Sequence, residues 1–215
     1  MILIPVKNLA TAKQRLASLL DQSTRTELAQ AMLLDVLGAV SNCCEKQAAI
    51  VTTDSHAIGL AQDFKFEIIE DNNVSETAAI ELATQVCESR GIESTLVIPG
   101  DIPLISSEEL DQILKAAPGE GSVLVPAADG RGTNAIFRRP AGLFPLRFGN
   151  DSFKPHLAAA RATGKPCTVL SLPGIALDID NPSDLRALSE ASGDTHAQRL
   201  VRKWNLAALP IAANQ

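Results

Sequence analysis

Three aspartates come directly after apolar segments and have the chemistry to hold a divalent cation. Asp101 follows Val97-Ile98-Pro99-Gly100, and Asp178 and Asp180 form an Asp-x-Asp pattern. Side chains alternate with a period of two in an extended segment, so both carboxylates of this pattern point to one face. Like charges on one face repel unless a cation or a proton lies between them. The sequence therefore predicts that Asp101, Asp178 and Asp180 converge on Mg²⁺, whereas Asp101 alone could cap a turn and Asp180 a helix.

The segment after the first apolar run carries three cations. Lys7 is followed by Thr11-Ala12-Lys13-Gln14-Arg15, which reads as the entry into a helix. Free N–H groups at a helix N-terminus, together with lysine and arginine charges, bind phosphate groups. The segment contains neither a P-loop nor a dinucleotide-binding glycine motif, and a solvated basic helix start would have the same residues. Lys7, Lys13 and Arg15 are therefore candidates for phosphate binding, with that simpler interpretation left open.

A glycine-rich turn and a later polar segment supply uncharged donors. The turn is Asp129-Gly130-Arg131-Gly132-Thr133-Asn134, and the later segment is Phe148-Gly149-Asn150-Asp151-Ser152. Glycine lets backbone N–H groups approach an anion, and the hydroxyls of Thr133 and Ser152 add donors. Ser152 is also expected to cap the helix that follows it. The same residues would suit a hairpin turn and an ordinary cap, and His156 is either a structural histidine or a ligand contact.

These candidates need a scaffold that brings distant segments to one edge. Short β-branched runs alternate with helical stretches, the order expected of a mostly parallel sheet flanked by helices. Ligands of such sheets bind beyond the carboxyl ends of the strands, where the polar segments above lie. Strands are predicted at residues 1–6, 48–53, 66–69, 95–99, 122–126, 134–138 and 167–172.

Local signals predict where several helices start. Ser106 and Glu109 form a capping box, and Asn181-Pro182 combines a capping residue with proline at the first helical position. A helical tail is expected from about residue 193, with loose last residues. We expect residues 1–215 to form one α/β domain. Helix starts are predicted near residues 12, 22–24, 55, 75, 107, 152, 182 and 193.

Composition excludes several classes of partner. The 215 residues carry a net charge of −6, which argues against binding duplex nucleic acid or an anionic membrane by charge. Aromatic residues are only 3 % of the chain, too few for a stacking platform for single strands. The four cysteines lack C-x-x-C spacing, so neither zinc nor a disulfide framework is predicted. The chain has no apolar run near the roughly 20 residues of a membrane span and no signal peptide pattern, so we expect a cytoplasmic protein.

Taken in order and in combination, five segments resemble the phospholactate guanylyltransferase family of coenzyme F420 biosynthesis, whose relatives use phosphoenolpyruvate or 3-phosphoglycerate. Each segment alone is weak, but together they extend over nearly the whole chain. They are Ile4-Pro5-Val6-Lys7 with Ala12-Lys13-Gln14-Arg15-Leu16, Pro99-Gly100-Asp101-Ile102-Pro103-Leu104, Asp129-Gly130-Arg131-Gly132-Thr133-Asn134, Phe148-Gly149-Asn150-Asp151-Ser152-Phe153 and Leu177-Asp178-Ile179-Asp180.

The resemblance implies a nucleotide-diphospho-sugar transferase (GT-A-like) fold, a homodimer, and a role for each segment. It implies that GTP and a small phosphorylated acid are the substrates and Mg²⁺ the cofactor. Asp101, Lys13 and Arg15 would be catalytic. The implied metal ligands are Asp101, Asp178 and Asp180; the implied acid-binding residues are Thr133, Gly149 and Ser152; the implied nucleotide-binding residues are Lys7, Lys13, Arg15, Thr52 and Thr77.

One segment departs from the family pattern. Val74-Ser75-Glu76-Thr77-Ala78-Ala79 stands where the family often has Gly-Leu-Asn-Ala near the base, with Thr77 in the place of the asparagine. Thr52 could contact the nucleoside or belong to a helix start. Two alternatives to guanylyl transfer remain at this point. One is another nucleotidyltransferase of this fold, with a molybdopterin or sugar phosphate acceptor, and the other is a non-catalytic nucleotide-binding module.

Overall fold

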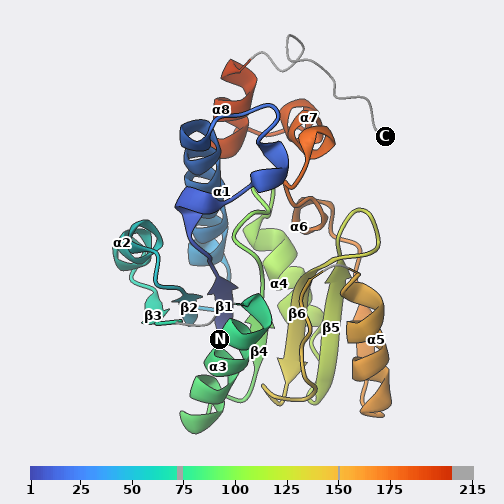
Figure 1. Cartoon of the computed structure of the whole chain (residues 1–215). Helices are drawn as coiled ribbons and strands as arrows, with labels where there is room; N and C mark the ends of the chain where they lie inside the picture. Colours follow the sequence, from blue (N-terminus) through green and yellow to red (C-terminus); the bar gives the residue numbers. More distant parts are fainter. Residues whose placement is uncertain (72–74, 150, 205–215) are drawn as a thin grey trace.

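A computed structural model describes residues 1–71, 75–149 and 151–204. In these residues seven strands form one sheet, in the order β3-β2-β1-β4-β6-β5-β7 (Figure 1). No helix among them is long and apolar enough to cross a membrane. The strands are β1 (Ile2–Pro5), β2 (Ala48–Val51), β3 (Glu67–Ile69), β4 (Thr95–Val97), β5 (Gly121–Pro126), β6 (Thr133–Arg139) and β7 (Cys167–Val169).

The prediction of a mostly parallel sheet is confirmed. β1 pairs in parallel with β2 and β4, β2 with β3, and β5 with β7, whereas β6 runs antiparallel to β4 and β5. Only residues 127–132 join β5 to β6. A connection this short makes a hairpin, because a parallel crossover needs a dozen or more residues. The glycine-rich turn of the sequence is the tip of that hairpin.

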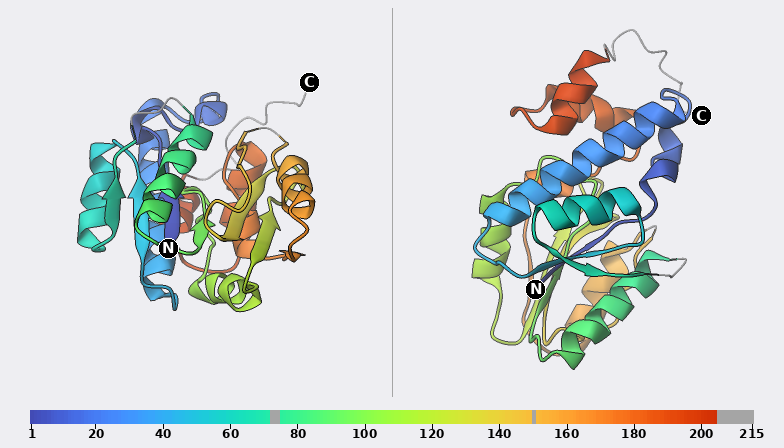
Figure 2. Two further views of the ribbon diagram at one scale, coloured as in Figure 1. Left: turned by 90° about the horizontal axis from the view of Figure 1, so that it is seen from below. Right: turned by 90° about the vertical axis from the view of Figure 1, so that its left-hand side faces the viewer.

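Helices cover both faces of the sheet, as the alternation along β1 requires (Figure 2). Ile2 and Ile4 pack on one face with apolar residues of α1, α2, α4, α7 and α8, and Leu3 packs on the other face with α3. Leu124 and Ile136 pack against α5. The helices are α1 (Gln22–Asn42), α2 (Ser55–Asp63), α3 (Glu76–Ser89), α4 (Ser107–Ala116), α5 (Phe153–Ala162), α6 (Pro173–Ala176), α7 (Pro182–Glu190) and α8 (His196–Lys203).

The helix predicted from Ala12 is wrong. Two short 3₁₀ turns, η1 (Leu9–Thr11) and η2 (Gln14–Leu16), stand in its place, and α1 starts only after its cap Asp21. The apolar residues whose spacing suggested a helix are buried by turns instead, as Leu16 and Leu20 show. Lys13 adopts a left-handed backbone conformation (φ 56°) between the two turns, which a helix would not allow.

The capping signals at Ser106 and Asn181 are confirmed. Ser106 and Glu109 form the capping box of α4, and Asn181 with Asp184 forms that of α7, whose first residue is Pro182. The seventh strand is shorter than predicted, and α6 follows it.

The predicted tail helix is α8, and it is attached to α1. The carboxylate of Asp35 in α1 accepts hydrogen bonds from the N–H groups of His196 (2.8 Å) and Ala197 (2.9 Å). Asp35 therefore satisfies free donors of the first turn of α8 from another helix. The predicted loose end, residues 205–215, lies outside the described residues.

Candidate active site

Two adjoining cavities lie at the carboxyl ends of β1 and β4. The β1-loop cavity, of about 420 Å³, is lined mainly by residues 5–9, 11–15 and 99–101. The hairpin cavity, of about 670 Å³, is lined mainly by residues of the 127–134 turn and by Phe148, Gly149, Asp151, Ser152, Asp178 and Asp180. Six residues line both: Lys7, Arg15, Glu76, Pro99, Asp101 and Asp180. The edge of the sheet predicted to bind ligands therefore carries the cavities.

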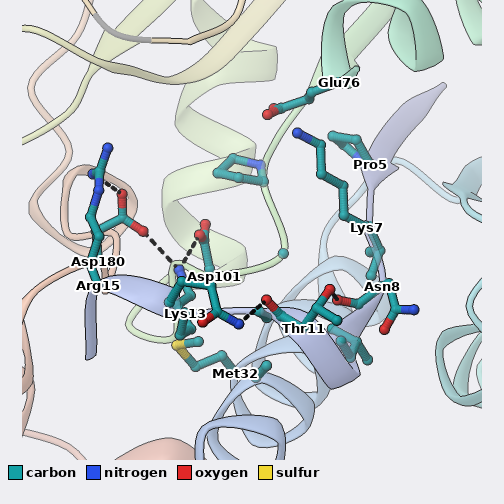
Figure 3. A pocket seen from close by; sticks show the side chains of 17 residues that line it. Pro5, Lys7, Asn8, Thr11, Lys13, Arg15, Met32, Glu76, Asp101 and Asp180 are labelled. Carbon is teal, nitrogen blue, oxygen red and sulfur yellow. Dashed lines mark hydrogen bonds and ion pairs between the residues drawn. The ribbon is translucent and has the colours of Figure 1, made fainter. Parts of the chain in front are cut away.

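Lys13 joins two of the three predicted aspartates. Its Nζ lies 2.6 Å from Oδ2 of Asp101 and 3.0 Å from Oδ1 of Asp180 (Figure 3). Arg15 Nη1 lies 3.0 Å from the other oxygen of Asp180. Burial of Lys13, whose side chain is 7 % exposed, would lower its pKa, but attraction to Asp101 and Asp180 outweighs burial and raises the pKa. Lys13 is thus a fixed positive charge between carboxylates.

Asp178 faces the hairpin cavity from a different support. Its Oδ1 accepts a hydrogen bond of 3.0 Å from Nδ2 of Asn134 on β6. The same Nδ2 lies 3.0 Å from the carbonyl oxygens of Ile175 and Ala176, so Asn134 also holds the chain that leads to Asp178. Burial, assisted by the charges of Asp101 and Asp180, raises the pKa of Asp178.

The three aspartates share the hairpin cavity, as the sequence predicted, but they do not form a metal cluster. Within the described ranges, no group of three or more His, Cys, Asp or Glu side chains is arranged to hold a metal ion. The ammonium of Lys13 lies between two of the carboxylates instead. Lys13 lines only the β1-loop cavity, so the hairpin-cavity side of the carboxylates is free of it.

Glu76 was not singled out from the sequence as a site residue. It is the first residue of α3, after the cap Ser75, and its carboxyl group points toward the ammonium of Lys7 (Figure 3). Burial raises the pKa of Glu76 to about 7, and the neighbouring charge of Asp101 adds to this effect while Lys7 opposes it. An acidic residue at a capped helix start, just beyond the edge of the sheet, was the signal that could have identified it.

The three residues predicted to bind the acid all line the hairpin cavity. Gly149 has φ +124°, with open space around its α-carbon, and Ser152 Oγ donates to Thr133 Oγ1 at 3.3 Å. The prediction that Ser152 caps α5 is wrong, because its backbone is helical and its side chain makes no capping hydrogen bond. Its hydroxyl turns to β6 instead.

His156 is a supporting residue rather than a ligand contact. It is 1 % exposed and lines neither cavity. Its Nε2 accepts the N–H of Arg147 (2.8 Å), which assigns the ring proton to Nδ1, 3.0 Å from Thr133 Oγ1. Burial, followed by the charge of Arg138, lowers the pKa of His156 to about 4, so the ring is neutral at pH 7. Thr133 oxygen thus accepts two hydrogen bonds, and its own proton remains available for a ligand.

The two threonines predicted to contact the nucleotide lie elsewhere. Thr52 is buried, donates to the carbonyl oxygen of Val6 (2.7 Å) and accepts from the N–H of Asp54 (3.0 Å). Thr77 accepts from the N–H of Phe148 (3.0 Å) and lines a separate cavity of about 280 Å³ beside α3. Both threonines hold loops of the site and line neither the β1-loop nor the hairpin cavity.

The hairpin tip carries a cation that sequence reasoning did not select. Asp129 Oδ1 accepts from the N–H groups of Arg131 (2.7 Å) and Gly132 (3.2 Å), and Gly130 supplies the positive φ of the turn. Arg131 extends from this turn to Asp151, with Nε 2.5 Å from Oδ1. The side chain therefore spans the two segments that border the predicted acid site.

Solved structures share this fold. A protein from Desulfovibrio desulfuricans G20, classed with the nucleotide-diphospho-sugar transferases, superposes with a TM-score of 0.78 at 19 % identity, covering 94 % of this chain and 93 % of that one. A 4-diphosphocytidyl-2C-methyl-D-erythritol synthase superposes with a TM-score of 0.59 at 15 % identity, covering 87 % and 95 %. At these identities the likeness shows the fold, which is the one predicted.

Closer likeness comes from sequence. The chain is 36 % identical over 203 residues to the phosphoenolpyruvate guanylyltransferase of Roseiflexus castenholzii, covering 94 % of this chain and 93 % of that protein. It is 31 % identical over 209 residues to the 2-phospho-L-lactate guanylyltransferase of Methanothermobacter thermautotrophicus, covering 97 % and 92 %. The profile described as "Guanylyl transferase CofC like" matches residues 1–214. With its fold, its paired cavities and these relatives, the chain belongs to the CofC-like guanylyl transferase family.

Proposed function

We propose that this protein transfers the GMP part of GTP to the phosphate of a three-carbon acid and releases pyrophosphate, as a step of coenzyme F420 biosynthesis. The observation that carries the proposal is the pair of adjoining cavities with shared Asp101, Asp180 and Arg15. When a nucleotidyl group passes from one substrate to another, the two substrates need adjacent binding sites with charged groups at the junction. The relatives named phosphoenolpyruvate guanylyltransferase and 2-phospho-L-lactate guanylyltransferase support the substrate class.

The β1-loop cavity suits the triphosphate, and the hairpin cavity suits the acid. Lys7, Lys13 and Arg15 place three cations at the first, where they would neutralise phosphate charge. At the second, Thr133 offers its hydroxyl proton, Gly149 an open backbone and Ser152 a hydroxyl oxygen that can accept a hydrogen bond. The acceptor's phosphate oxygen then faces the α-phosphorus across the junction.

The reaction needs alignment rather than proton transfer. An oxygen of the acceptor phosphate forms a bond to the α-phosphorus of GTP, and the bond from that phosphorus to the β-phosphate oxygen breaks, so pyrophosphate leaves. A phosphate monoester is already largely dianionic near neutral pH, so no general base is required. Lys13 and Arg15 would stabilise the charge on the leaving group.

From the family resemblance, Asp101, Asp178 and Asp180 would hold Mg²⁺ on the hairpin-cavity side of their carboxylates, which requires these side chains to come closer together than the described residues place them. Their oxygen atoms are the donors that Mg²⁺ prefers, and Lys13 contacts Asp101 and Asp180 from the other cavity. Asp178 has a hydrogen bond from Asn134 but no ion pair among the described residues, and its raised pKa reflects burial next to like charges. Bound there, the ion would neutralise phosphate charge and align attacking and leaving oxygens.

The test is a screen of substrates. GTP, ATP, CTP and UTP are each combined with phosphoenolpyruvate, 2-phospho-L-lactate and 3-phospho-D-glycerate, with Mg²⁺, and pyrophosphate release and product mass are measured. We expect turnover with GTP and at least one acid. Asp101→Asn should reduce kcat at least about 100-fold, whereas Asp63→Asn, at an exposed position of α2, should not. Glucose 1-phosphate is added to the screen as a sugar phosphate acceptor. Turnover with it and with none of the three acids, or nucleotide binding with no turnover in the whole screen, would contradict the proposal.

A homodimer in the cytoplasm is proposed with this function, from the resemblance to the family. Sedimentation equilibrium should give about twice the monomer mass of 22.7 kDa. A monomer that is fully active would overturn the dimer without affecting the reaction.

A further inference from the structure

The acid end of the hairpin cavity has one cation among the residues that line it. Lys7 and Arg15 lie at the junction with the β1-loop cavity, because they line both cavities. Around Thr133, Gly149 and Ser152 the charged residues are Asp129, Asp151 and Arg131. A ligand that carries both a phosphate and a carboxylate would meet two like charges there, with Arg131 as its counter-ion.

Arg131 is already bound to a carboxylate in a geometry that a ligand could adopt. Its Nε lies 2.5 Å from Oδ1 of Asp151, and its Nη2 lies 3.4 Å from Oδ2. Two N–H groups of the guanidinium thus face the two oxygens of one carboxylate, the bidentate arrangement that arginine forms with carboxylates. The side chains of Arg131 and Asp151 are 66 % and 60 % exposed, so ligands can reach both.

Exchange of this partner costs little. An exposed ion pair contributes little to stability, because water solvates both groups once they separate. Asp151 has a second cation beside it when it leaves Arg131: Lys154, in the first turn of α5, lines the same surface depression as Arg131 and Asp151. The turn that carries Arg131 is held by the backbone hydrogen bonds to Asp129, which do not depend on Asp151.

We propose that Arg131 binds the carboxylate of the acceptor acid, which replaces the carboxylate of Asp151 on the guanidinium. This inference rests on the proposed function and deepens it, because the carboxylate is what the three acids share and what sugar phosphates lack. Arg131 then determines acceptor class. The hydroxyl groups of Thr133 and Ser152 can bind oxygen atoms of an acid or of a sugar phosphate. The guanidinium of Arg131 favours only a ligand that carries a carboxylate.

The two partners of the ion pair should act in opposite directions. Arg131→Ala removes the counter-ion, so KM for the acid should rise about 10- to 100-fold with little change in KM for GTP. Asp151→Asn removes the competing carboxylate and keeps a side chain that tolerates the left-handed backbone of that position (φ 56°), so KM for the acid should fall. A purely structural ion pair would give the same direction for both variants.

The experiment measures KM, kcat and direct binding for the wild-type enzyme and the two variants. Phosphoenolpyruvate and 3-phosphoglycerate are compared with glycerol 3-phosphate, in which a hydroxymethyl group replaces the carboxylate. Binding of each compound is measured by calorimetry without GTP. Arg161→Ala is the matched control, because Arg161 is an exposed arginine in the last turn of α5. We expect Arg131→Ala to remove the wild-type preference for 3-phosphoglycerate over glycerol 3-phosphate.

The outcomes separate this inference from the proposed function. Wild-type turnover with an unchanged KM in Arg131→Ala, or a raised KM in both variants, overturns the role of Arg131 and leaves guanylyl transfer intact. Acid binding that depends on Arg131 without turnover supports the role of Arg131 and contradicts the reaction. Absence of both binding and turnover in the wild type overturns both.

Discussion

The Nζ of Lys13 and the Oδ2 of Asp101 lie 2.6 Å apart, although 88 residues separate them in the chain. Lys13 reaches this position from a left-handed turn, and Asp101 from the end of β4. Because Lys13 also contacts Asp180, one ammonium holds together carboxylates from two distant segments. The site is therefore assembled around a charge that belongs to the chain itself.

Replacement of Lys13 by Gln should lower the rate of catalysis more than the same replacement of an exposed lysine does. Removal of the ammonium leaves Asp101 without its ion-pair partner and Asp180 with Arg15 alone, and it removes a charge from the phosphate site. We expect kcat to fall at least about 100-fold. Steady-state pyrophosphate release is the measurement, and Lys115→Gln, at an exposed position of α4, is the control. Equal rates for Lys13→Gln and the control would contradict the role of Lys13.

Removal of Mg²⁺ should abolish turnover without unfolding the free protein. Lys13 already compensates Asp101 and Asp180 in the absence of a metal ion, so chelation leaves no new repulsion between them. With EDTA, pyrophosphate release should drop to background and return when Mg²⁺ is added in excess. The urea midpoint of unfolding should stay the same. A large loss of stability with EDTA would show that the ion has a structural role.

Replacement of Asn134 by Ala should leave the carboxylate of Asp178 less firmly positioned. The amide of Asn134 holds the carbonyl oxygens of Ile175 and Ala176 and the carboxylate of Asp178, and its loss takes a donor from each of them, although the carbonyl of Ala176 keeps the N–H of Ala128. The expected cost is about 1–3 kcal/mol in unfolding free energy, together with weaker Mg²⁺ activation. Denaturant unfolding and Mg²⁺ titration of activity measure the two effects. Asn42→Ala, which removes an exposed amide at the end of α1, should change neither by more than about 0.5 kcal/mol.

Stability should depend on His156 below pH 6.5. The pKa of His156 is about 4 in the folded protein and about 6.5 when the chain is unfolded. Between these values the unfolded state binds a proton that the folded state does not, so unfolding becomes easier as pH falls. This contribution is absent above pH 7 and reaches roughly 3 kcal/mol of lost stability near pH 4.

The comparison that isolates this effect is the difference between wild type and His156→Gln. The variant should be less stable at pH 7, because Thr133 and the N–H of Arg147 lose their partner, but the gap should narrow as pH falls from 6.5 to 4. This difference in stability is obtained from the unfolding free energies of both proteins, measured by denaturant titration at several pH values. His56→Gln, exposed on α2, should show no such narrowing. A constant gap would mean that His156 accepts a proton in the folded state.

Features that depend on nearest neighbours in the chain could be predicted from the sequence. The capping boxes at Ser106 and Asn181 join residues three apart, so their signal is complete within one turn. The order of strands and helices followed from periodicity, and the carboxyl edge of the sheet then located Asp101, because parallel strands bring their carboxyl ends to one edge. Asp178 and Asp180, which lie between α6 and α7, were predicted from their Asp-x-Asp spacing.

Features that depend on distant contacts could not be predicted in this way. Ser152 has the chemistry of a cap, but its hydroxyl is engaged by Thr133, 19 residues earlier. Glu76 reads as an ordinary first-turn acid until Lys7 and Asp101 are placed beside it. Lys13 lies in a left-handed turn and not in the predicted helix, because its ammonium pairs with Asp101 and Asp180. In each case, a contact between distant segments outweighed the local preference.

The ion pair between Lys13 and Asp180 has a consequence for the time course of synthesis. The two residues are 167 positions apart, so the ribosome adds the lysine long before the aspartate. A nascent chain that has completed β1 to β6 still lacks Asp178, Asp180 and the helices α7 and α8 that pack against α1. A chain that stops after β6 thus has most of the sheet but lacks two of the three aspartates of the proposed phosphoryl-transfer centre.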